Sequence, residues 1–107
     1  ELVKSFKGIT SKMAETYEKK NHDYGNSFDK SLDKFGLIAS VVRLGDKMNR
    51  IESLTRKTVQ NPEYPSISVK DANLVKDESI RDTLLDMANY AIMTVMWMDN
   101  QKKCDNG

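Results

Sequence analysis

Apolar residues recur every three or four positions along three long stretches of this sequence, and this spacing limits the fold more than any other feature. The stretches run over residues 2–20, from Ser31 or Phe35 to Val59, and over residues 77–101. Residues at this spacing share one face of an α-helix, so each stretch predicts an amphipathic helix. The chain has two prolines and five glycines, a scarcity that also favours helices over sheets.

Two segments that lack this spacing predict the connections between the helices. Residues 21–28 contain Asn, Asp and Gly, which favour a loop or a tight turn. Residues 61–76 contain Pro62 and Pro65 and predict an exposed loop with a short strand at residues 67–69. A loop of this length within a helical bundle indicates a lid or a contact between subunits.

The predicted architecture is a single all-α domain over residues 1–107, built as a bundle of three long helices. A chain of 107 residues supports one modest core. The third helix is apolar around much of its circumference, so three helices leave apolar surface uncovered. Pairing with a second copy would bury that surface. Gly36 and Gly45 fall inside the second predicted helix, where they indicate close helix packing or close approach of a ligand.

Composition argues against several functions. The 17 basic and 16 acidic residues give a net charge of +1, so we expect no direct binding to nucleic acid, which normally needs a basic excess. No stretch reaches the roughly 18 apolar residues of a membrane span, so we expect no membrane partner. The single Cys104 cannot form an internal disulfide, which favours the reducing cytoplasm. Its polar neighbours Lys102, Lys103 and Asp105 are typical of an incidental exposed thiol rather than a nucleophile.

Three acidic residues form the sharpest chemical pattern, in the third predicted helix. Glu78, Asp82 and Asp86 are spaced by four and followed by Asn89, so their side chains stack along one helix face, about 6 Å apart. Carboxylates held this close near a core need a compensating cation. Oxygen ligands of this kind suit Mg²⁺ or Mn²⁺. The alternative is a solvated acidic stripe with Arg81 as its local partner.

The second predicted helix carries a basic set with one embedded acid. Arg43, Asp46 and Arg50 are separated by three and four positions, and Lys47 lies beside them, so all four fall near one face. Facing an acidic helix, Asp46 could complete a metal site while the basic side chains neutralise phosphate charge. The alternative is a set of ion pairs within and between helices, each of which contributes little to stability.

The predicted loop mixes aromatic and hydrogen-bonding side chains. Its aromatic groups are His22, Tyr24 and Phe28, and its hydrogen-bonding groups are Asn21, Asp23 and Asn26. Such a mixture suits a pocket for a base or a ribose. The alternative is that Tyr24 and Phe28 anchor the loop to the bundle, and that His22 is an ordinary loop histidine rather than a general base or metal ligand.

Three segments together carry a resemblance to a known family. They are KNHDYGNSF at residues 20–28, RLGDKMNR at 43–50 and DESIRDTLLDMANYA at 77–91. They resemble the nucleotide modification associated domain of phage and bacterial proteins, which is similar in turn to the MazG-type all-α nucleoside triphosphate pyrophosphohydrolases. The resemblance covers residues 17–98, and the last segment is its most specific part.

The resemblance implies a fold, a reaction and a set of metal ligands. MazG-type enzymes are all-α dimers or tetramers that use Mg²⁺ to cleave nucleoside triphosphates to monophosphate and pyrophosphate. Their ligands come from two facing helices, a Glu-Glu-x-x-Glu set on one and a Glu-x-x-Asp set on the other. The region of the first set holds Asp46, Asn49 and Glu52 here. The second set is represented by Glu78, Asp82 and Asp86, spaced by four rather than three.

The leading hypothesis is a Mg²⁺-dependent pyrophosphohydrolase of a nucleoside or deoxynucleoside triphosphate, working as a homo-oligomer in the cytoplasm, which is the host cytoplasm for a phage protein. Its metal ligands are Asp46, Glu78, Asp82 and Asp86. The first three also take part in catalysis, in which a carboxylate accepts the proton of the attacking water. The phosphate contacts are Arg43, Lys47 and Arg50, and the sugar or base contacts are Asn21, Asp23, Tyr24 and Asn89.

Two other classes of protein fit the same residues. One is a non-catalytic protein that binds or sequesters nucleotides in association with phage nucleotide modification. The other is a structural helical dimerisation module whose acidic stripe is solvated surface. Only the enzyme requires a water-activating carboxylate beside a metal ion, and the structural module predicts that Asp82→Ala changes little.

Overall fold

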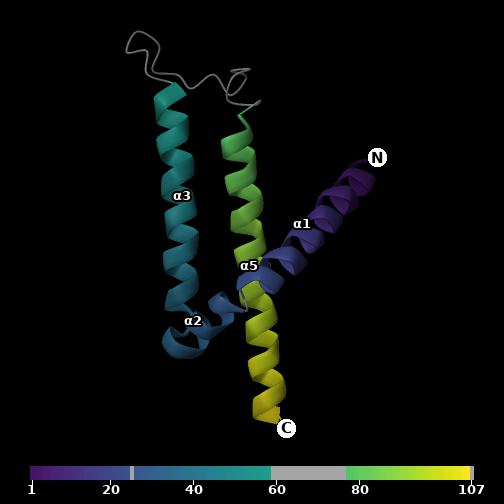
Figure 1. Cartoon of the computed structure of the whole chain (residues 1–107), viewed down its shortest axis with the longest axis vertical. Coiled ribbons are helices and arrows are strands. Elements are labelled where there is room, and N and C mark those ends of the chain that lie inside the picture. The colour runs from purple at the N-terminus through teal and green to yellow at the C-terminus, as the bar shows by residue number, and fades with distance from the viewer. Residues whose placement is uncertain (25, 59–76, 107) are drawn as a thin grey trace.

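The computed structural model describes residues 1–24, 26–58 and 77–106, and within these ranges the chain is all-helical (Figure 1). This confirms the predicted all-α class. The helices are α1 (Leu2–Tyr24), α2 (Ser27–Phe35), α3 (Ile38–Thr58) and α5 (Glu78–Asn106). The loop and short strand predicted within residues 61–76 lie outside the described residues. None of the described helices is long and apolar enough to cross a membrane.

The predicted loop at residues 21–28 is wrong in extent, because α1 continues through it to Tyr24 and α2 begins at Ser27. The Asn21 side chain lies inside α1 and satisfies a backbone group beyond the helix end. Its amide oxygen accepts a hydrogen bond of 3.2 Å from the backbone N–H of Asn26. Asn26 has φ 57° and ψ 30°, a left-handed conformation that Asn adopts more readily than most residues, and it redirects the chain into α2.

The predicted second helix is divided into α2 and α3 at Gly36. This glycine has φ 73°, a conformation that costs other residues steric strain. Its N–H donates to the carbonyl of Leu32 at 2.7 Å, and its own carbonyl accepts from Ala39 at 3.0 Å. Gly36 thus ends α2 and starts α3 in a tight corner, whereas the sequence placed it inside a helix.

The start of α5 is capped by Asp77. One oxygen of its carboxylate accepts hydrogen bonds from the backbone N–H groups of Ser79 at 2.8 Å and Ile80 at 3.2 Å. These are two of the N–H groups that a helix start leaves without a partner in the helix. The acidic start of the predicted third helix therefore has a structural role as well as a favourable position at the helix dipole.

Helices α3 and α5 pack side by side and run antiparallel (Figure 1). Two contacts between their side chains fix the register. The hydroxyls of Ser40 and Thr94 form a buried hydrogen bond of 2.9 Å, and Nε of Arg50 donates to the hydroxyl of Thr83 at 3.3 Å. The two helices therefore form the rigid pair on which the rest of the described chain is built.

The core lies where α2 meets this pair. It is built from the buried Phe28, Leu32 and Ala39, against which Tyr90, Met93 and Trp97 pack. The rings of Phe28 and Tyr90 meet edge to face, with centroids 4.9 Å apart. The Trp97 indole N–H donates to Asp33 at 2.9 Å, which ties α5 to α2. Of the alternatives left open by the sequence, Phe28 is therefore an anchor.

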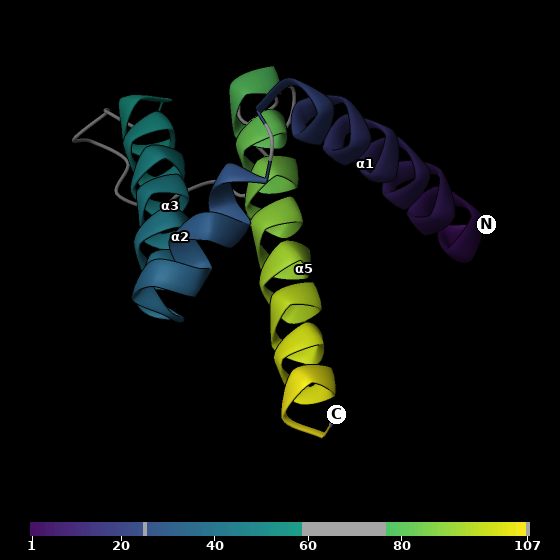
Figure 2. The same ribbon diagram turned by 60° about the horizontal axis from the view of Figure 1, so that its bottom comes forward.

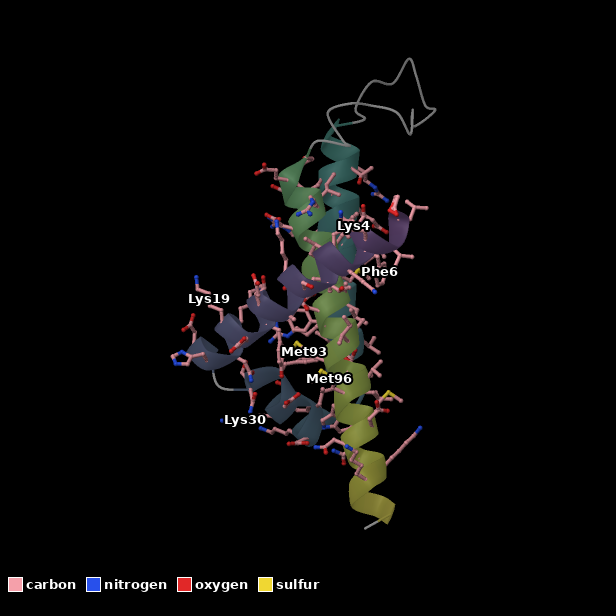
Figure 3. All side chains as sticks on the ribbon, turned by 90° about the vertical axis from the view of Figure 1, so that its right-hand side faces the viewer. Lys4, Phe6, Lys19, Lys30, Met93 and Met96 are labelled. Carbon is pink, nitrogen blue, oxygen red and sulfur yellow. The ribbon has the colours of Figure 1, made fainter. Side chains whose placement is uncertain are left out.

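The C-terminal part of α1 crosses α5 near the middle of α5. The N-terminal half of α1 extends away from the α3–α5 pair (Figures 1 and 2). Met13 is buried, but Leu2, Val3 and Phe6 are 65–89% exposed. Phe6 and Lys4 both lie on this extended part, whereas Met93 lies on α5 beside the core (Figure 3). The predicted apolar stripe of α1 is thus covered only in its second half.

Candidate functional site

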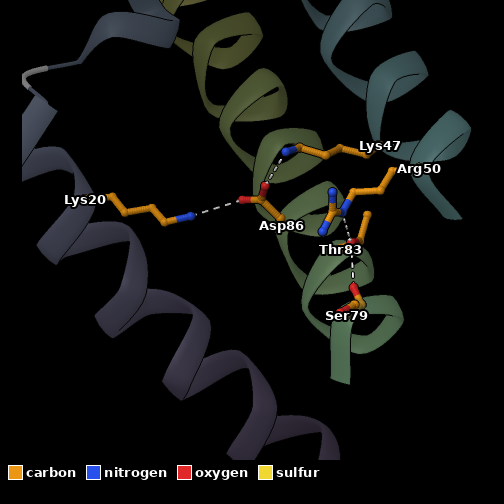
Figure 4. Close-up of polar contacts among 6 residues, drawn as sticks. All are labelled: Lys20, Lys47, Arg50, Ser79, Thr83 and Asp86. Atoms are coloured by element: carbon orange, nitrogen blue, oxygen red, sulfur yellow. Dashed lines mark hydrogen bonds and ion pairs between the residues drawn. The ribbon is translucent and has the colours of Figure 1, made fainter. Parts of the chain in front are cut away.

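Asp86 lies at the centre of the site, between two lysines from different helices. One carboxylate oxygen is 3.2 Å from Nζ of Lys20 on α1, and the other is 2.7 Å from Nζ of Lys47 on α3 (Figure 4). Lys20 is mostly exposed, while Lys47 and Asp86 are about three-quarters covered. This cluster, which we call the Asp86 cluster (Lys20, Lys47 and Asp86), joins all three long helices at one point.

The charges of the two lysines hold Asp86 ionised. Burial on its own would raise the pKa of the Asp86 carboxyl, but the hydrogen bonds and positive charges of Lys47 and Lys20 outweigh it and hold the pKa below its ordinary value. The cluster carries two positive charges and one negative charge, so it is net positive. It is therefore suited to a further anionic group.

Lys47 also links the site to the core. Its ammonium lies 5.7 Å from the centre of the Tyr90 ring, within the range of a cation–π contact. Tyr90 in turn packs on the buried Phe28. The Lys47 side chain is therefore positioned by an aromatic ring on one side and a carboxylate on the other.

Arg50 lies two turns nearer the α3 C-terminus than Arg43 and reaches α5. Its Nε donates to the hydroxyl of Thr83, which donates to the carbonyl of Ser79 at 2.6 Å (Figure 4). Within the described part of the chain, no hydrogen bond is found for the terminal guanidinium nitrogens. Because a guanidinium presents a planar fork of donors, these remain suited to an oxyanion.

Two cavities lie on either side of Lys20 between α1 and α5. The first, of about 340 Å³, is lined by Lys20, Asn21, Asp86 and Asn89, among others. The second, of about 430 Å³, shares Lys20, Asp86 and Asn89 and adds Asp82. Both volumes fall in the range of small-molecule sites. The predicted residues Asn21, Asp82, Asp86 and Asn89 are thus brought together around one lysine.

Asp46 on α3 and Asp82 on α5 lie on the same side of the helix pair. Successive residues of a helix are turned by about 100°. Asp82 comes one position before Thr83, and Met93 comes one position before Thr94. Both threonines contact α3. Asp46 likewise precedes Lys47 on α3. Because the helices are antiparallel, this same offset turns all of these residues toward the side on which α1 lies.

Six predicted residues do not line either cavity, and two of them, Lys47 and Arg50, contact α5 as described above. The other four, Asp23, Arg43, Asp46 and Glu78, are exposed. The backbone of Tyr24 closes α1, but its side chain is outside the described residues. His22 is exposed on α1 and has its Nδ1 3.5 Å from Asp23.

Three residues that line one cavity have the donor chemistry for Mg²⁺. Carboxylate and amide oxygens of Asp82, Asp86 and Asn89 line one cavity, and such oxygens are the preferred ligands of Mg²⁺. However, both oxygens of Asp86 face ammonium groups. Across the ranges that the structure describes, no three His, Cys, Asp or Glu side chains are grouped to hold a metal ion.

Sequence reasoning missed Lys20 and Thr83. Lys20 directly precedes the Asn21-His22-Asp23 segment, which was the available signal, but its partner Asp86 is 66 positions further along the chain. Thr83 lies between the acidic residues and positions Arg50. Neither contact follows from spacing within a single helix.

No family model, no curated protein and no solved structure matches this chain. The functional argument therefore depends on the geometry of the described residues, and the resemblance remains an expectation.

Proposed function

We propose that this chain binds the phosphate groups of a nucleotide at the Asp86 cluster. The observation that carries the proposal is that one carboxylate shares its two oxygens between Lys20 and Lys47. An ammonium group has three donors, so each lysine keeps donors for an anion. A phosphate chain carries more charge than Asp86 and would compete for both lysines.

The neighbouring cavity supplies a place for the nucleoside. Asn21 and Asn89 line it with amide groups, which donate and accept hydrogen bonds and can recognise the edge of a base or a ribose hydroxyl. Its volume of about 340 Å³ is at the lower end of the range for small-molecule sites. The phosphates would extend from this cavity toward Lys47 and Arg50.

The reaction we propose is hydrolysis of a nucleoside or deoxynucleoside triphosphate to monophosphate and pyrophosphate with Mg²⁺, as the resemblance implies. Asp82 and Asp86 are the candidate ligands nearest the lysines, and Asp46 and Glu78 are candidate further ligands. This is supported by Asp82 and Asp86 lining one cavity and by the turn of Asp46 toward the same side of the helix pair. We place the protein in the cytoplasm, as a dimer or tetramer.

A second candidate is a protein that binds nucleotides without hydrolysing them. It is favoured by the state of Asp86, because both of its oxygens are engaged by ammonium groups. A carboxylate that serves only to hold two lysines apart and in place needs no metal ion. On this alternative the Asp86 cluster is a binding site and nothing more.

The test is to incubate the protein with each common ribonucleoside and deoxynucleoside triphosphate in the presence of Mg²⁺. Hydrolysis predicts release of pyrophosphate with at least one of them, and binding predicts a rise in melting temperature. A rise in melting temperature without pyrophosphate would select the non-catalytic candidate. If no nucleotide changes the melting temperature or yields pyrophosphate, both candidates are wrong.

A further inference from the structure

The side of the α3–α5 pair that is turned away from α1 carries a broad uncovered apolar surface. The large apolar side chains on it are 41–63% exposed. We call this surface the uncovered face, and its large apolar residues are Ile38, Val41 and Met48 on α3 and Leu84, Ile92, Val95 and Met98 on α5. Only four apolar side chains are buried among the described residues, so the core of one chain is small.

The positions of these residues along their helices show that the apolar residues of α3 and those of α5 belong to one face. On α3, Val41 comes one position after Ser40, which contacts α5. On α5, Val95 comes one position after Thr94, which contacts α3. In an antiparallel pair the same offset on both helices turns the residues to the same side. At about 100° per residue, Asp86 and Asn89 are turned to the opposite side of α5 from Val95. The uncovered face therefore lies opposite the Asp86 cluster.

The register of the pair places small residues at the middle of the uncovered face. Ser40 is level with Thr94, and Arg50 is level with Thr83, so the midpoint Gly45 is level with Ala88. A Cβ added at Gly45 would have nothing within 4 Å, so packing inside the chain does not require glycine there. Glycine in a helix costs about 1 kcal/mol relative to alanine, which points to close approach of a helix from outside.

Opposite charges mark one end of the same face. Glu52 is two positions beyond Arg50 on α3, and Arg81 is two positions before Thr83 on α5, so they are level with each other. Both side chains are exposed. Neither forms a salt bridge to another described residue. From these two charges to the other end of the uncovered face, the apolar residues named above and Gly45 and Ala88 leave it uncharged.

We propose that the uncovered face binds a second copy of this chain through a two-fold axis parallel to the helices. Each α3 then packs antiparallel against α5 of the partner, which gives an all-antiparallel four-helix bundle. At the same level, Gly45 meets the partner subunit's Ala88, and Glu52 meets the partner subunit's Arg81. The surface is therefore complementary to itself in size and in charge, which is what a two-fold interface requires.

The first test is the oligomeric state measured by sedimentation equilibrium, with a matched pair of variants. Val41 and Val3 are 63% and 65% exposed, but only Val41 lies on the uncovered face. We expect a wild-type dimer, a dissociation constant raised at least about 100-fold by Val41→Glu, and no change with Val3→Glu. A wild-type chain that is monomeric at all concentrations, or a Val41→Glu protein that dimerises like wild type, would overturn the proposal.

The second test exchanges the two charges. Glu52→Arg and Arg81→Glu should each weaken the dimer about tenfold, because each places two like charges opposite one another. The double variant E52R/R81E restores opposite charges and should recover wild-type dimerisation. A double variant as weak as either single variant contradicts the register. The assay contains no nucleotide, so its outcome is independent of whether the proposed phosphate site is correct.

Discussion

At the scale of single residues, Asp86 does two things that different variants can separate. It neutralises part of the charge of Lys20 and Lys47, and it is the best-placed candidate ligand for a cation. Asp86→Asn keeps its shape but removes the charge. We expect pyrophosphate release to fall to background, while binding of the nucleotide measured without Mg²⁺ is kept or strengthened because a competing anion is gone.

The readouts for this variant are pyrophosphate release and calorimetric titration with the same nucleotide. Asp99→Asn, on the exposed end of α5, removes the same charge elsewhere on the helix and should change neither. If Asp86→Asn hydrolyses triphosphates as fast as wild type, Asp86 has no part in the reaction.

The lowered pKa of Asp86 makes a prediction about pH. A carboxyl whose pKa is lower in the folded state than its ordinary value of 3.8 stabilises the fold above that value and loses this contribution as pH falls through the folded pKa. The free energy of unfolding of wild type should therefore exceed that of Asp86→Asn by a constant amount near neutral pH. The difference should shrink only below about pH 4.

Urea unfolding of both proteins between pH 3 and pH 7 measures this difference. A difference that disappears already near pH 6 would show that the Asp86 carboxyl is not held by the lysines in the folded state.

At the scale of helices, the ends of α2 and α5 are fixed by single residues. Asp77→Ala removes the oxygen that accepts from Ser79 and Ile80, and we expect the free energy of unfolding to fall by about 1 kcal/mol. Asp77→Ser keeps an acceptor at the cap and should lose much less. Urea denaturation of the two variants checks this, and equal losses would contradict the assigned cap.

Two glycines should respond in opposite directions to the same change. Gly36→Ala forces a side chain into φ 73° and should lower the free energy of unfolding by about 1 kcal/mol or more. Gly8→Ala, in α1 with nothing within 4 Å of the added Cβ, should raise it by about 0.5–1 kcal/mol. Effects of the same sign, measured by urea denaturation, would contradict the described corner.

The sequence predicted the three long helices because their apolar spacing is a local property. It did not predict the break at Gly36, since Gly36 and Gly45 look alike in the sequence and only contacts with Leu32 and Ala39 distinguish the corner from a helix interior. It also predicts too early an end for the first helix, because Asn21 is typical of a helix break and its hydrogen bond from the backbone N–H of Asn26 depends on how the chain turns after α1.

The candidate site was predictable to the extent that its residues share a helix. Asp82, Asp86 and Asn89 are adjacent on α5 by spacing alone and line one cavity, and Asn21 lines a second cavity together with Asp86 and Asn89. Lys20 was not predictable, because its contact with Asp86 depends on where α1 crosses α5.

At the scale of the whole molecule, the α3–α5 pair has two unlike sides. One side carries the Asp86 cluster and α1, and the other is the uncovered face. Dimerisation through the uncovered face would therefore leave both copies of the Asp86 cluster open to a ligand. It would also bury the apolar surface that a core of four apolar side chains leaves exposed among the described residues.

The central claim is that Lys47, held by Asp86 and Tyr90, binds nucleotide phosphate. The most direct measurement is calorimetric titration of wild type, Lys47→Gln and Lys4→Gln with the triphosphate that raises the melting temperature most. Lys4 is an exposed lysine on the extended half of α1, so Lys4→Gln removes the same charge away from the site. Lys47→Gln loses one charge-assisted hydrogen bond, so we expect it to bind the triphosphate about 10- to 100-fold more weakly than wild type. Lys4→Gln should bind like wild type. Equal affinities for all three proteins would contradict the claim.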